Sequence, residues 1–294
     1  MRALSRWYAG VLYVISLSAY AVIPYCPPSL EAPLDNVVPG KLIAFPRGHL
    51  FQPLIADPKE TRFFIGYRDY ERTVGGRAVG VIGFGETFPL FRRAGACATD
   101  GLQLDLVGGG VARFVLDDSR KDLIDADYTF GLPLSWRRGN WSMRSRIYHE
   151  SSHLGENHLF QAGASERVKR SYDSMDFIAS YDKERWRIYY GGEYLLRHHP
   201  TIDPLGLHVG AEYYGPRNMF GGSARWITGL DLKAWDEYAF EPEVSLKTGL
   251  SFGGRQANQH HLQLLLEWYD GHANEGVFFE EDVRYSGVGV YFGF

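Results

Sequence analysis

The sequence is poor in the features that mark metal and nucleotide sites. It has two cysteines in 294 residues, Cys26 and Cys97, and neither a CxxC pair nor a zinc-type spacing of cysteine and histidine. It also lacks a glycine-rich phosphate-binding loop. These absences argue against a zinc module and a P-loop nucleotide-binding domain. Whether the two cysteines form a disulfide is left open by the sequence.

The sequence also lacks a long apolar run after its N-terminus and an excess of positive charge. Aromatic residues make up 15% of the chain, there are 34 glycines, and the formal net charge is -4. Aromatic- and glycine-rich sequence without long apolar runs is typical of many amphipathic strands. The charge gives no case for nucleic-acid binding. Lysine is scarce beside arginine, which suits a polar interior of fixed hydrogen bonds to carboxylates.

The N-terminus resembles a secretory signal. Arg2 and Arg6 precede the apolar stretch 10–23, and an A-x-A site ends at Ala21. We therefore expect a signal peptide at 1–21. A membrane-anchoring helix is the weaker alternative, because the apolar stretch is short and prolines follow at once.

Composition divides the rest of the chain into two segments. Residues 22–60 are rich in proline and have no periodicity, which predicts an extended periplasmic segment. Residues 61–294 are expected to form the folded domain.

The stretch 141–153, WSMRSRIYHESSH, has a period of two with two very different faces. One face carries Trp141, Met143 and Ile147, and the other carries Arg144 and Arg146. Strict alternation over this length predicts a β-strand. An apolar outer face opposite a charged inner face is typical of a transmembrane barrel strand.

Alternating stretches of this kind recur from residue 61 to the C-terminus, with turn signals between them. The sequence predicts an all-β protein, a transmembrane antiparallel β-barrel of twelve strands, with the terminal Phe294 on an apolar face like the insertion signal of outer-membrane barrels. We expect it in the bacterial outer membrane, with outer-membrane lipids and the barrel-insertion machinery as partners. The predicted strands are 61–71, 77–89, 101–117, 123–137, 141–152, 172–182, 186–197, 206–215, 224–235, 243–253, 259–269 and 283–294.

Four motifs resemble an uncharacterised family of bacterial outer-membrane barrel proteins, a domain of unknown function. The motifs are FQPLIADP (51–58), ADY with GLPL (126–134), YHESSHLG (148–155, a YHxSSHLG pattern) and YDGH (269–272). The resemblance covers residues 50–294 and implies a barrel fold. It implies no activity.

His149 and Ser151 form an H-x-S pair whose side chains point to the same side of the strand. The parity of Trp141 and Ile147 directs both toward lipid, near the outer end of a rising strand. This placement is similar to that in outer-membrane phospholipase A and the lipid A deacylases. The similarity implies a serine lipid-acyl hydrolase, with Ser151 as nucleophile and His149 as base.

The residue that orients the histidine is expected on the next strand. Asp173 is the leading candidate because it shares the apolar face of that strand, whereas Glu166 and Asp176 are weaker candidates. An H-x-S spacing also arises by chance, and an interfacial histidine is commonly an amphipathic boundary residue. The sequence therefore leaves open whether the protein is an enzyme.

The inward face carries both signs of charge, which is compatible with either a filled lumen or a channel. Paired arginine and carboxylate side chains can fill a narrow twelve-stranded lumen, which we favour over a narrow solute channel. The inward residues are Arg144, Arg146, Glu150, Arg187, Glu193, Arg197, Glu212, Asp231, Lys233 and Glu267.

One acidic loop is a weak candidate for a calcium site. The loop from Asp270, with Glu280–Asp282, offers oxygen ligands for calcium, but its spacing matches no known loop geometry. We interpret it as solvated, and we predict no cofactor. The oligomeric state is left open.

Overall fold

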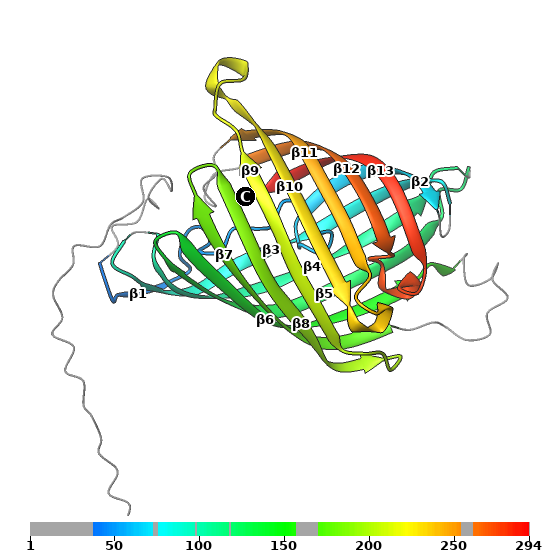
Figure 1. Cartoon of the computed structure of the whole chain (residues 1–294), viewed down its shortest axis with the longest axis horizontal. Coiled ribbons are helices and arrows are strands. Elements are labelled where there is room, and N and C mark those ends of the chain that lie inside the picture. The colour runs from blue at the N-terminus through cyan, green and yellow to red at the C-terminus, as the bar shows by residue number, and fades with distance from the viewer. Residues whose placement is uncertain are drawn as a thin grey trace, which may run out of the picture.

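Twelve long antiparallel strands form one closed sheet (Figure 1). The computed structural model describes residues 38–72, 76–97, 99–117, 119–156, 170–253 and 261–293. Each strand pairs with its neighbours in the chain, and β13 pairs with β2 to close the barrel. The prediction of a twelve-stranded antiparallel barrel is confirmed. The barrel strands are β2 (Phe63–Arg72), β3 (Ala78–Ala94), β4 (Gly101–Val115), β5 (Leu123–Arg138), β6 (Trp141–Leu154), β7 (Arg170–Lys183), β8 (Trp186–His199), β9 (Leu205–Tyr214), β10 (Ala224–Trp235), β11 (Pro242–Gly253), β12 (His261–His272) and β13 (Asp282–Gly293).

Outside the barrel wall, a short strand β1 (Leu42–Ala44) pairs with the end of β3. Three 3-10 turns lie in loops: η1 (Phe220–Gly222), η2 (Asp236–Tyr238) and η3 (Gly276–Phe278). In the described part of the chain, no helix has the length and apolar character needed to cross a membrane. The predicted signal peptide lies outside the described residues, as do Cys26 and Glu166. Cys97 is disulfide-bonded.

The barrel is apolar outside and charged inside. Large apolar side chains such as Phe130, Ile147 and Leu266 are at least half exposed on the outer wall, whereas Arg113 and Arg187 inside are almost fully buried. A soluble protein would have the reverse arrangement, because exposed apolar surface is costly in water. The outer wall therefore has the character expected for contact with lipid.

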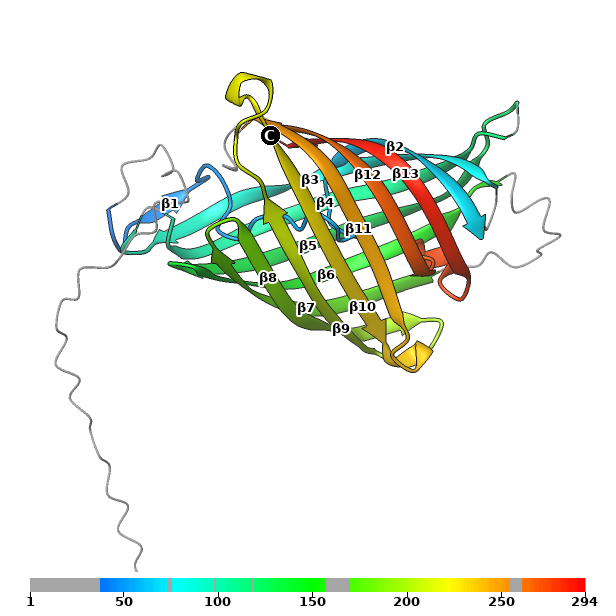
Figure 2. The same ribbon diagram turned by 45° about the horizontal axis from the view of Figure 1, so that its top comes forward.

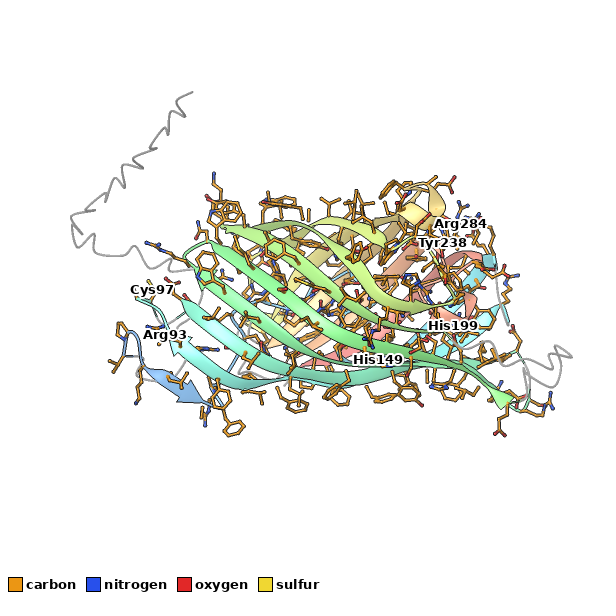
Figure 3. The ribbon with its side chains drawn as sticks, turned by 90° about the horizontal axis from the view of Figure 1, so that it is seen from below. Arg93, Cys97, His149, His199, Tyr238 and Arg284 are labelled. Atoms are coloured by element: carbon orange, nitrogen blue, oxygen red, sulfur yellow. The ribbon has the colours of Figure 1, made fainter. Side chains whose placement is uncertain are left out.

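The two ends of the barrel differ. Short turns at 139–140 and 184–185 lie at the same end as the last residues of β13, and the longer connection between β6 and β7 lies at the other end. Bacterial barrels have short periplasmic turns and longer outer loops. Figure 3 shows Cys97 and Arg93 at the short-turn end, with His149 and His199 toward the long-loop end.

The second half of the proline-rich segment lies inside the barrel. Figures 1 and 2 show it in blue, running between the front and back walls. Leu50, Phe51, Leu54 and Ile55 are all almost fully buried. The sequence predicts an extended periplasmic segment over 22–60, whereas residues 46–60, here called the plug, lie in the lumen.

The plug is held by hydrogen bonds from distant strands. The Ile55 amide donates to Glu212 Oε1 at 2.7 Å, and Ser245 Oγ donates to the Ala56 carbonyl at 2.7 Å. Gly229 of β10 lies against the same part of the plug: a Cβ atom added to Gly229 would lie 2.8 Å from Ile55 Cβ. The plug does not pair with a strand, so its buried backbone amide and carbonyl groups need other hydrogen-bond partners. Side chains of the lumen provide them.

Buried ion pairs join the plug to the wall and the wall strands to each other. Lys59 Nζ lies 2.7 Å from both Asp127 and Glu150. Arg113 binds Asp125 with two hydrogen bonds of 2.8 and 2.9 Å, and both side chains are at most 1% exposed. The predicted network of arginine and carboxylate side chains in the lumen is therefore present. Further pairs are Glu60–Arg144, Asp57–Lys233, Arg146–Asp176, Arg187–Glu212 and Arg137–Asp182.

Lys59→Met tests this buried network. The change leaves Asp127 and Glu150 buried without their cation, so we expect a loss of about 3–5 kcal/mol of unfolding free energy. Urea unfolding in detergent, followed by heat-modifiable gel mobility, measures it. Arg77→Met is the control, because the Arg77–Asp69 pair is exposed and contributes little. Equal stability of the two variants would contradict the structural role of the network.

Candidate active site on the outer wall

β6 and β7 place four polar side chains on the lipid-facing wall, and three of them are joined by hydrogen bonds. His149 lies directly opposite Asp173 in the register of the two strands, and Ser151 lies opposite Ser171. All four residues point outward, because the residues between them, such as Glu150 and Tyr172, are buried in the lumen. Strand parity thus places the polar group among exposed apolar side chains.

The imidazole of His149 connects two residues of β7. Its Nδ1 atom lies 2.8 Å from Asp173 Oδ1, and its Nε2 atom lies 3.3 Å from Ser171 Oγ. An ionised carboxylate only accepts hydrogen bonds, so Nδ1 carries the proton. When the imidazole is neutral, its Nε2 atom accepts the hydrogen bond of the Ser171 hydroxyl. A serine, a neutral imidazole and a carboxylate in this order form the arrangement that activates a hydroxyl as a nucleophile.

The hydroxyl beside the imidazole is not the one that the sequence indicated. The structure brings Asp173 to His149 as expected, but the hydrogen-bonding hydroxyl belongs to Ser171 instead of Ser151. The strand predicted from the sequence begins at Tyr172, which leaves Ser171 in the preceding loop. In the structure β7 begins at Arg170, and Ser171 gains the same parity as Asp173. An S-x-D spacing at the start of this strand was the missed signal.

The two weaker candidates for orienting the histidine do not join the group. Asp176 points into the lumen, where it accepts hydrogen bonds from Arg146. Glu166 lies outside the described residues.

The site is open to its surroundings. The His149 and Asp173 side chains are 50% and 41% exposed. Phe130 lies opposite His149 on the β5 side, and Met175 follows Asp173 on the same face of β7; both are exposed. An acyl chain that lies in the bilayer would contact these apolar neighbours directly.

No metal centre is found in the part of the chain that the structure describes, where no three histidine, cysteine or acidic side chains converge. In the acidic loop that offers oxygen ligands for calcium, the Asp270 carboxylate is held by Arg72 and by Arg284, the latter at 2.5 Å.

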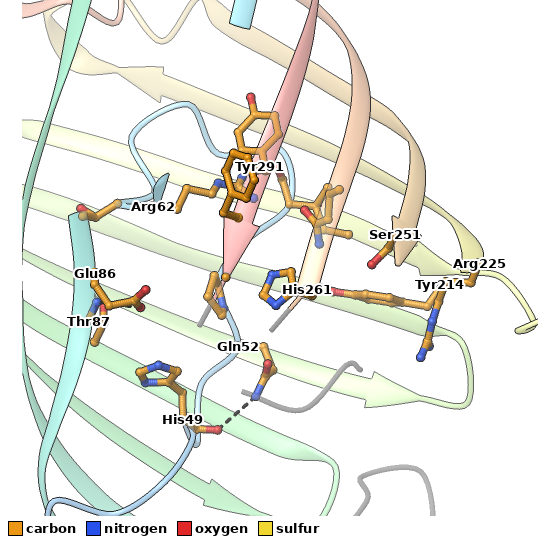
Figure 4. Close-up of a pocket in the computed structure, with 16 residues that line it drawn as sticks. His49, Gln52, Arg62, Glu86, Thr87, Tyr214, Arg225, Ser251, His261 and Tyr291 are labelled. Carbon is orange, nitrogen blue, oxygen red and sulfur yellow. Dashed lines mark hydrogen bonds between the residues drawn. The ribbon is translucent and has the colours of Figure 1, made fainter. Parts of the chain in front are cut away.

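Small cavities lie in the lumen beside the plug, and two of them lie toward opposite ends of the barrel. The cavity at the short-turn end has a volume of about 80 Å³, and its lining includes His49, Glu86 and His261 (Figure 4). The cavity at the other end has a volume of about 50 Å³ and is lined in part by Arg146 and Tyr238. Each has room for a few water molecules.

Comparison with known proteins places the chain in a family. A family model described as "Protein of unknown function (DUF1207)" matches residues 35–294. The chain belongs to the DUF1207 family. The resemblance found in the sequence motifs is thereby confirmed. No curated protein matches the chain.

Solved structures with a similar fold include outer-membrane phospholipases. Outer membrane phospholipase A from Escherichia coli matches with a TM-score of 0.56 at 15% identity, over 82% of this chain and 93% of that chain. The outer membrane phospholipase of Salmonella typhi, a dimer with bound calcium, matches with a TM-score of 0.54 at 15% identity, over 83% and 94%. At this identity the likeness shows the fold alone. The DUF1207 protein is therefore an outer-membrane-type β-barrel with a charged, filled lumen.

Conductance measurement tests whether the plug closes the lumen. We expect the purified protein in planar bilayers to give no large stable current steps, because residues 46–60 and their ion pairs occupy the barrel. Large, stable steps in the wild-type protein would contradict this and restore the solute channel that the sequence left open.

Proposed function

We propose that this DUF1207 protein hydrolyses an acyl ester of a membrane lipid at the outer wall of its barrel. The observation that carries the proposal is the hydrogen-bonded series Ser171, His149 and Asp173, exposed on the wall that contacts lipid. We further propose that the chain is exported by its N-terminal signal peptide to the bacterial outer membrane, and that outer-membrane lipids and the barrel-insertion machinery are its partners there.

The three residues supply the nucleophile, the base and the charge-stabilising group that ester cleavage requires. Ser171 Oγ attacks the acyl carbonyl carbon while its proton passes to His149 Nε2, and Asp173 stabilises the imidazolium that forms. The imidazolium then protonates the departing alkoxide, which leaves an acyl ester on Ser171. A water molecule, deprotonated by His149, releases the fatty acid and regenerates the serine. The serine–imidazole distance of 3.3 Å is typical of a resting site that tightens around its substrate.

The position of the site favours a lipid substrate over a soluble one. Bilayer lipids present their ester bonds near the membrane interface, and the three residues lie toward the long-loop end of the barrel wall. A lipid reaches them by lateral diffusion, so no entry path through the lumen is needed.

Alanine variants test the catalytic assignment. We expect Ser171→Ala and His149→Ala each to lower hydrolysis of phospholipid in mixed micelles on the order of 10³-fold or more, as for other serine triads. Ser145→Ala is the control: it lies on the same face of β6, where its hydroxyl donates to the Asp176 carbonyl, away from the site. Absence of hydrolysis in the wild-type protein would overturn the proposal.

Covalent labelling separates the two serines. A fluorophosphonate probe reacts with an activated serine hydroxyl, and peptide mass spectrometry identifies the residue. We expect the label on Ser171, with labelling abolished by His149→Ala. A label on Ser151 would support the hydrolase but assign the nucleophile to the residue that the sequence indicated.

A further inference from the structure

In β8, side chains alternate between the lumen and the outer wall, and this alternation is interrupted near the long-loop end of the strand. Tyr190 and Tyr194 are exposed on the outer wall, whereas Tyr189 and Leu195 point into the barrel. Simple alternation would then direct every odd-numbered residue of the strand inward. This is why the sequence predicted that Arg197 faces the lumen.

A β-bulge reverses this parity. Ser174 of β7 pairs with Leu195, but the preceding residue Asp173 pairs with Arg197, so Leu196 is an extra residue on β8. Bulges of this kind redirect the side chains that follow them. Arg197 is consequently exposed on the outer wall, opposite Asp173, and the prediction that it lines the lumen is wrong.

The bulge also changes what surrounds the proposed site. His199 pairs with Ser171 and is exposed as well, and Figure 3 shows it near His149 at the same end of the barrel. Two basic side chains of β8 therefore lie across from the serine and the carboxylate of β7. Without the extra residue, both would point into the lumen.

The Arg197 side chain forms no ion pair or hydrogen bond with the residues that the structure describes. The carboxylate opposite it in the strand register, that of Asp173, binds the His149 imidazole through Oδ1 at 2.8 Å. A charged side chain on the lipid-facing wall is costly at the bilayer midplane and tolerated near the interface. At that depth the available anions are the phosphates of lipids, which a guanidinium binds with two parallel hydrogen bonds.

We propose that Arg197, turned outward by the β8 bulge, binds the phosphate of the lipid whose acyl ester lies at Ser171. This inference rests on the proposed hydrolase for its catalytic consequence. It makes Arg197 a specificity-determining residue that selects phosphate-bearing acyl esters over neutral ones.

Lipid retention tests the binding without any chemistry. The Ser171→Ala protein, in micelles of neutral detergent doped with phosphatidylglycerol or diacylglycerol, is examined by native mass spectrometry. We expect Arg197→Gln in this background to lower phosphatidylglycerol retention about tenfold, because one charge-assisted contact is lost. Diacylglycerol retention should not change. Arg185→Gln is the matched control, an exposed arginine at the short-turn end.

Kinetics separate headgroup binding from a role in the transition state. In the otherwise wild-type protein, we expect Arg197→Gln to raise KM for phosphatidylglycerol and to leave the kinetics with diacylglycerol unchanged. An equal fall in kcat for both lipids would overturn headgroup binding and indicate stabilisation of the ester oxyanion instead.

The two proposals fail separately. If the wild-type protein retains phosphatidylglycerol through Arg197 but hydrolyses nothing, the phosphate site stands and the hydrolase fails. If hydrolysis occurs but Arg197→Gln retains phosphatidylglycerol as the parent does, the phosphate site fails and the hydrolase stands.

Discussion

Closure of the sheet by pairing of β13 with β2 is the constraint on which the rest of the structure depends. A strand edge exposed to lipid would leave backbone groups without hydrogen bonds, and closure removes that edge. Once the sheet is closed, every residue of a strand faces either lipid or lumen. Whether a functional side chain faces lipid or lumen therefore depends on its even or odd position along the strand.

The lumen shows one consequence of this constraint. Twelve strands enclose a lumen whose inward face is charged, and the plug occupies part of that lumen. The plug also provides charges that pair with those of the wall. Asp57 pairs with Lys233 and Glu60 with Arg144, while Lys59 bridges two wall carboxylates. The wall and the plug thus complete each other.

The outer wall shows the opposite consequence. A polar group there has few partners, because its neighbours are apolar and lipid-facing, so an ordered polar cluster on this wall is notable. His149, Asp173 and Ser171 satisfy one another across two adjacent strands. Arg197 joins this face only because one extra residue on β8 shifts the phase of the strand.

The sequence by itself determined the class of fold, the number of strands and the face on which His149, Ser151 and Asp173 lie, because alternation with a period of two is a local property. Only the tertiary structure decided which hydroxyl meets the imidazole, since cross-strand register and the exact start of β7 bring Ser171 there. It also decided the place of the plug, which has no periodicity and is held by contacts distant in the chain, such as that of Ile55 with Glu212, 157 residues away. Arg197 points outward because of a single bulge in the pairing of β7 with β8. The periodic pattern of one strand cannot predict such a bulge, because a bulge depends on how the strand pairs with its neighbour.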